Sequence, residues 1–68
     1  MKYLVIVERG TNSFGAYVPD LPRCAVVADT KEEALKLIRE AVVLHVESLR
    51  EAGEPIPGPA SMTEYVQV

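Results

Sequence analysis

Apolar residues along this chain repeat with two different periods, which separate strands from a helix. Residues 2–8 (KYLVIVE) are rich in β-branched and aromatic side chains and predict a strand. Residues 14–19 (FGAYVP) predict a second strand that Pro19 ends, because proline cannot donate to a ladder. Residues 24–29 (CAVVAD) predict a third strand, and residues 62–68 (MTEYVQV) predict a fourth.

The residues between the third and fourth strands follow the helical period instead. Thr30 to Glu33 fits the T-x-x-E capping box, so we expect the helix to begin there. It should run to about Ala52, with Gly53 as the residue after its C-cap. Its apolar residues cover an arc of about 200°, whereas a helix on one sheet face needs only about 100°. The extra width indicates a second contact.

The first strand is apolar on both faces, which a sheet covered on one side would not require. Tyr3, Val5 and Val7 share one face, and we assign this larger set to the helix side. Leu4 and Ile6 share the other face and are expected, with Tyr17, to line a subunit interface. A chain of 68 residues with 49% hydrophobic residues supports self-association as a homodimer or homotetramer, because so small a domain buries little surface alone.

Three loops connect these elements. Residues 9–13 predict a hairpin turn, and residues 54–61 an extended, proline-rich connector. Residues 19–24 (PDLPRC) form a stiff corner, for which a purely structural role and a docking role both stay open. The pattern therefore predicts one α+β domain over residues 1–68, ordered β-β-β-α-β. A three-stranded antiparallel meander, a fourth strand and one helix on one sheet face make up this prediction.

Charge and composition exclude several classes of protein. The net charge is −3 and Lys and Arg do not cluster, so direct binding of nucleic acid is not expected. The first apolar run is too short to span a membrane and no signal-peptide cleavage pattern follows it, which predicts a cytoplasmic protein. One cysteine and one histidine allow neither an internal disulfide nor a zinc site, and we expect no metal and no cofactor.

Catalytic residues are not expected either. His45 lies at the centre of the apolar helix stripe, where a structural histidine bonded to a backbone carbonyl is the favoured interpretation. Cys24 begins a strand next to Arg23, and a buried apolar role is favoured over a reactive thiol. The carboxylates at Glu8, Asp20, Asp29 and Glu64 lie near strand ends or turns, where capping and turn roles are simpler than a metal site.

The order of motifs resembles the HicB-type antitoxin domain. The resemblance covers nearly the whole chain and depends on YVPDLPRC at 17–24, DTKEEAL at 29–35 and GEPIPGP at 53–59. It implies a fold similar to a truncated ribonuclease H core without that enzyme's activity. It also implies a partner of HicA type, a small basic ribonuclease whose catalytic histidine the antitoxin covers, and assembly as dimers or tetramers.

Two departures from the family's pattern stand out. Arg23 occupies a position where the family usually has glycine, and the sequence given ends at Val68, where many members continue into a DNA-binding module. The leading hypothesis is an antitoxin-like module that neutralises a HicA-like toxin. The alternatives are a solitary oligomerising module with another partner or ligand, and, last, a nuclease of ribonuclease H type. The expected partner-binding residues are Tyr17, Asp20, Leu21 and Arg23.

Overall fold

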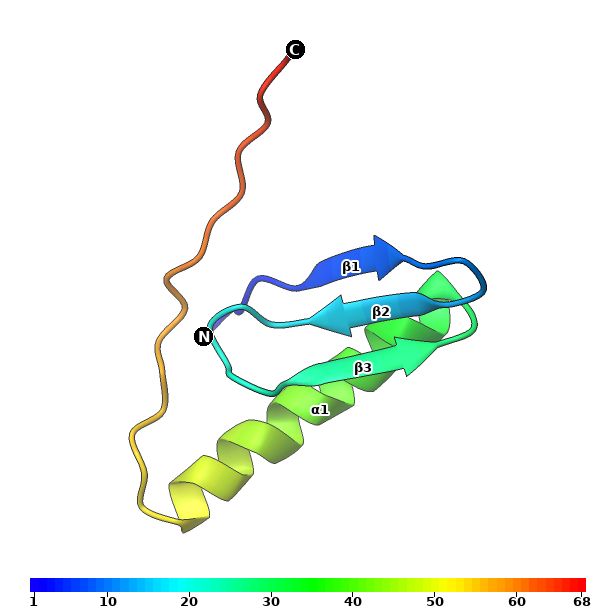
Figure 1. The fold of residues 1–68 in the computed structure, drawn as a ribbon. Helices are drawn as coiled ribbons and strands as arrows, with labels where there is room; N and C mark the ends of the chain where they lie inside the picture. The colour runs from blue at the N-terminus through cyan, green and yellow to red at the C-terminus, as the bar shows by residue number, and fades with distance from the viewer.

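The computed structural model describes all residues, 1–68, and has three strands and one helix. Strands β1 (Ile6–Arg9), β2 (Phe14–Tyr17) and β3 (Ala25–Ala28) form an antiparallel sheet in the order β1-β2-β3. Helix α1 (Lys31–Glu51) then crosses one face of that sheet (Figure 1). The predicted α+β class, the antiparallel meander and the single covering helix are confirmed.

The second and third predicted strands differ from the structure by one or two residues at their ends, and the first and fourth differ more. Strand β1 contains only residues 6–8 of the predicted 2–8 and extends one residue further, to Arg9. The predicted fourth strand is wrong for this chain, because residues 62–68 pair with no other strand. They are exposed along their whole length and leave the body of the domain (Figure 1). Alternation of side chains identifies a segment that suits a sheet, but a strand also needs a neighbouring backbone edge.

The strand faces follow the predicted alternation. Register pairs Ala16 with Val26 and Val7 with Ala16, so these three side chains lie on the same face of the sheet. Tyr3, Val5 and Val7 pack against the buried core on the helix side, which confirms the face assigned to them. Tyr17 and Val27 lie on the outer face, and Val27 is 72% exposed. The outer face therefore keeps apolar side chains without cover.

The core between sheet and helix is small. Only seven of the 68 residues are buried, and Leu21 and Ile38 are the largest side chains among them. The other five are Ala16, Val18, Cys24, Ala28 and Ala34. The helix contributes Ala34 and Ile38, both in its N-terminal half, and packs mainly on β2 and β3. Further along, Val43 and Leu44 are 56% and 67% exposed, so the extra apolar width of the helix has no cover within the chain.

Both helix ends lie where the sequence predicts them. Thr30 is the N-cap, and its side chain accepts a hydrogen bond of 3.1 Å from the Glu33 amide. Gly53 has a φ of 71° and follows the C-cap. Its amide donates to the Arg50 carbonyl and the Glu54 amide donates to the Leu49 carbonyl at 2.9 Å, which is the Schellman arrangement. The helix is too polar, for its length, to cross a membrane.

Replacing either end of the helix should lower stability by a similar amount. Thr30→Ala removes the side-chain acceptor and should cost about 1 kcal/mol of unfolding free energy. Gly53→Ala should also cost about 1 kcal/mol, because an added Cβ meets no atom within 4 Å and only the left-handed backbone opposes it. Gly58→Ala is the matched control, since Gly58 also has open space but no positive φ. Urea unfolding followed by circular dichroism measures all three, and equal midpoints for Gly53→Ala and Gly58→Ala would contradict the assignment.

Candidate functional site

The corner between β2 and β3 is built from two consecutive turns. The Leu21 amide donates to the Val18 carbonyl, and the Cys24 amide donates to the Leu21 carbonyl, each at 3.1 Å. The Val18 amide closes the corner by donating to the Cys24 carbonyl at 3.1 Å. With Pro19 and Pro22 restricting the backbone between these bonds, the corner is a rigid element.

The corner has a buried side and an exposed side. Val18, Leu21 and Cys24 point into the core, and the side chain of Leu21 is only 1% exposed. The prediction that Leu21 contacts a partner is therefore corrected: this side chain holds the corner onto the domain. Cys24 is buried as well, and burial raises the pKa of its thiol, opposite to the lowering that exposure beside Arg23 would have produced.

Arg23 is the one non-glycine residue with a positive φ, at 68°. A side chain in this left-handed region is strained because its Cβ crowds the backbone, so most proteins use glycine or asparagine there. The backbone of the second turn imposes this φ, and the departure from glycine noted in the sequence is thus a real conformational cost. The Arg23 side chain is exposed on the outer rim of the corner.

Asp20 binds a segment that lies forty residues away in sequence. Its Oδ2 accepts hydrogen bonds from the amides of Ala60 and Ser61, both at 3.0 Å, and its Oδ1 accepts from Ser61 Oγ at 2.8 Å. Hydrogen bonds from Ser61, and then from Ala60, hold the pKa of Asp20 below its ordinary value. The sequence predicted that Asp20 would bond to amides of its own turn. The structure instead makes it the anchor of the C-terminal segment.

A second contact fastens the same connector. The Tyr3 hydroxyl donates to the carbonyl of Pro57, joining the start of the chain to residues 54–61. Sequence reasoning missed both anchors. The proline-rich composition indicated that the connector is extended, but nothing in a linear pattern identifies which distant side chain meets an extended segment.

The remaining candidates do not gather into one site. His45 is half-buried, but its ring makes no hydrogen bond, so the predicted bond to a backbone carbonyl is wrong. Glu8, Asp29 and Glu64 are exposed on β1, before the helix and in the C-terminal segment. No three His, Cys, Asp or Glu side chains lie close enough together to hold a metal ion.

The residues predicted to line a subunit interface lie together on the outer face. Ile6 and Tyr17 are register partners on β1 and β2, and Leu4 precedes Ile6 on the same face. Leu4 and Ile6 are half-buried, and Tyr17 is 36% exposed. Their association with another subunit stays a prediction.

The fold and the corner define a small α+β domain that holds an extended segment at the junction of two strands. The chain belongs to the family of HicB-like antitoxins of bacterial toxin-antitoxin systems, whose profile matches residues 3–68. A UPF0150 protein of Thermoplasma acidophilum is 41% identical over 84% of each chain. An uncharacterised 14.9 kDa protein of Haemophilus phage HP1 is 30% identical over 97% of this chain, which spans only 50% of the phage protein.

A solved structure supports the same family. A chain of the HicA3 and HicB3 toxin-antitoxin complex is similar to this domain, with a TM-score of 0.73 and 28% identity. The similarity covers 88% of this chain and 70% of the other. The resemblance predicted from the motifs is therefore confirmed.

Loss of the Asp20 carboxylate should free the connector. In Asp20→Ala, the Ala60 and Ser61 amides lose their acceptor, and their hydrogen exchange should approach the rate of the exposed residues 62–68. The control is Glu40→Ala, which removes an exposed carboxylate that makes no hydrogen bond. Unchanged exchange in Asp20→Ala would show that the anchor does not exist in solution.

Acid should have the same effect on the wild-type protein. Because the folded pKa of Asp20 is lowered, the contact is intact at neutral pH and down through the ordinary aspartate value of about 3.9. It is lost only as the pH falls further, through the lowered pKa. Amide chemical shifts of Ala60 and Ser61 followed by NMR should titrate below that ordinary value, and a midpoint above it would contradict the assigned hydrogen bonds.

Relief of the backbone strain at Arg23 should stabilise the domain. Arg23→Gly should raise the unfolding free energy by up to about 1 kcal/mol, since glycine adopts φ of 68° without steric cost but loses more chain entropy. Arg23→Val should lower stability, because a β-branched side chain fits this region worst. Thermal denaturation of both variants is the measurement, and a glycine variant less stable than the valine variant would refute the strain.

Proposed function

We propose that this domain acts by binding a small basic toxin of HicA type and covering its active site. The observation that carries the proposal is the similarity, at 28% identity, to a chain from a complex of HicA3 with HicB3. Membership of the HicB-like antitoxin family over residues 3–68 supports it. The domain needs no catalytic group for this task, because blocking an active site requires shape and charge alone.

The exposed rim of the β2–β3 corner is the proposed contact. Tyr17 and Arg23 offer an aromatic ring and a guanidinium group, two side chains that interfaces favour. The corner beneath them is held by three backbone hydrogen bonds and by the buried Leu21 side chain. Little conformational entropy is then lost when a partner binds. Asp20 belongs to this rim, but a basic partner reaches its carboxylate only in competition with Ala60 and Ser61.

Electrostatics should assist the encounter. The chain carries a net charge of −3, and a toxin that binds RNA phosphates must be basic. Opposite net charges raise the association rate, and this gain falls as salt screens the charges. The acidic face of the helix, with Glu40 and Glu47 exposed, is the competing contact surface.

Binding variants on the two surfaces separate these alternatives. At about 300 mM salt, the variant Tyr17→Ala/Arg23→Ala, which removes the ring and the guanidinium group, should weaken the affinity for the basic toxin at least about tenfold, or about 1.4 kcal/mol. Glu40→Gln/Glu47→Gln removes two exposed carboxylates from the helix but keeps the chain negatively charged, and at the same salt it should leave the affinity within about threefold if the corner is the contact. Leu21 is left unchanged, because a polar residue at this buried position would damage the fold itself.

Isothermal titration against each small basic protein encoded beside this one measures the affinities. The association rate, followed by stopped flow, should fall between about 50 and about 300 mM salt. Loss of binding in the helix variant alone would place the contact on α1. No binding by the wild-type protein would favour the solitary module. RNA cleavage that requires Mg²⁺ and is abolished by Glu8→Ala would instead support the nuclease alternative.

A further inference from the structure

The last seven residues of the chain, 62–68, are a strand-like segment without a partner. Tyr65 is 99% exposed, Val66 84% and Met62 82%, and none of the backbone hydrogen bonds involves residues 62–68. In an extended chain, Met62, Glu64, Val66 and Val68 share one face, and Thr63, Tyr65 and Gln67 share the other. An isolated segment of this kind exposes both apolar side chains and unpaired backbone groups, which favours addition to a sheet.

The sheet offers an edge that can receive such a segment. The order β1-β2-β3 leaves the outer side of β1 without a neighbour. Helix α1 lies mainly under β2 and β3 and approaches β1 much less closely. The helix-facing side of β1 and of the residues before it is therefore only partly covered, although Tyr3, Val5 and Val7 lie on that side.

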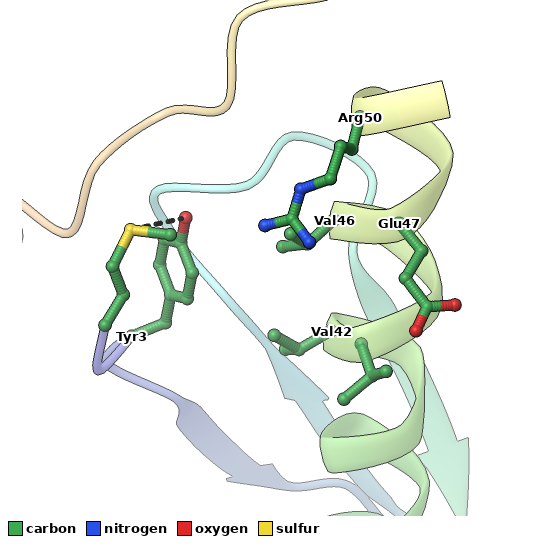
Figure 2. A pocket seen from close by; sticks show the side chains of 7 residues that line it. Tyr3, Val42, Val46, Glu47 and Arg50 are labelled. Atoms are coloured by element: carbon green, nitrogen blue, oxygen red, sulfur yellow. Dashed lines mark hydrogen bonds between the residues drawn. The ribbon is translucent and has the colours of Figure 1, made fainter. Parts of the chain in front are cut away.

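An apolar groove lies on this uncovered side. A cavity of about 260 Å³ lies between Tyr3 and the helix residues Val42 and Val46, with Glu47 and Arg50 at its rim (Figure 2). A neighbouring cavity of about 290 Å³ continues past Val5. Figure 2 shows Tyr3 on one wall and the helix side chains on the opposite wall, with open space between them. A strand added at the edge of β1 would lie beside this groove and direct every second side chain into it.

We propose that the β1 edge and its groove take residues 62–68 of a second copy of this chain, in a reciprocal exchange. The face with Val66 and Val68 enters the groove and contacts Val42 and Val46. The opposite face, with Tyr65, extends the outer surface of the sheet next to Leu4 and Ile6. This interaction is independent of toxin binding, since it uses the β1 edge rather than the rim of the β2–β3 corner.

The occupant is a second copy because the connector directs the segment away from its own domain. Tyr3 holds the carbonyl of Pro57, and Asp20 holds Ala60 and Ser61. With these points fixed, residues 62–68 continue outward into solvent (Figure 1). A second copy related by a two-fold axis presents the same edge and the same segment. Each segment then pairs with the β1 edge of the other copy, which gives a closed dimer.

Charge and core size agree with this occupant. Glu64 lies on the same face as Val66. Arg39 and Arg50 lie at the groove with one carboxylate, Glu47, so the charged side chains of the groove are net positive and complement Glu64 on the entering face. Seven buried residues are a small core for a domain of 68, and exchange would add buried apolar side chains from each copy.

The test compares two double variants of the segment that add equal charge to opposite faces. Val66→Asp/Val68→Asp should shift the 68-residue protein from dimer to monomer in sedimentation velocity at about 10 μM, with at least about a tenfold weaker dimer. Thr63→Asp/Gln67→Asp should keep the dimer, because its new charges face away from the groove. Neither variant changes a core residue, so an unchanged helical circular dichroism spectrum confirms that each remains folded.

Isotope-filtered NMR on a mixture of labelled and unlabelled protein identifies whose segment fills the groove. Nuclear Overhauser contacts between Val66 or Val68 of one copy and Tyr3 or Val42 of the other support the proposal. A monomer whose segment contacts its own groove, or a monomer with a free segment, overturns it. A dimer that survives Val66→Asp/Val68→Asp but is lost in Leu4→Lys also overturns it, and assigns association to the outer sheet face.

Discussion

The stability of this domain depends on a single buried interface, between one face of a three-stranded sheet and one stripe of a helix. That interface contains seven side chains, three of which come from the corner between β2 and β3. Other apolar side chains pack only partly against it, and several, including Val27 on the outer sheet face and Val43 on the helix, are mostly exposed. A domain of this size exposes a large share of its surface even when folded. Its remaining apolar surfaces are therefore available for contacts with other chains.

The corner has a buried inner side and an exposed outer side because its residues alternate in direction. Val18, Leu21 and Cys24, spaced three residues apart, anchor it from inside. Asp20 and Arg23 between them face outward, one bound to the connector and the other in a strained conformation. Strain of this kind persists only where the surrounding structure imposes it. Three hydrogen bonds and two prolines supply that constraint here, so the backbone of the outer rim has a fixed shape.

Sequence reasoning succeeded where the signal is local and failed where it is not. The helix ends were predictable, since Thr30 and Gly53 act through the backbone of adjacent residues. The helix-facing set of the first strand was predictable because side chains alternate along any strand. The partner of Asp20 was not, because it lies forty residues away in a segment without regular structure. The prediction of a fourth strand was wrong for a related reason. Its residue pattern suits a sheet, but the pattern of one segment does not say which strand would pair with it.

The buried thiol allows transient opening of the domain to be measured by chemical labelling. Cys24 is the single cysteine, lies 4% exposed inside the corner, and has a pKa raised by burial. A thiol reagent can reach it only when the corner separates from the helix, so the labelling rate counts those excursions. Val18 and Leu21 hold the same corner, so the labelling rate of Cys24 reports how often the corner opens.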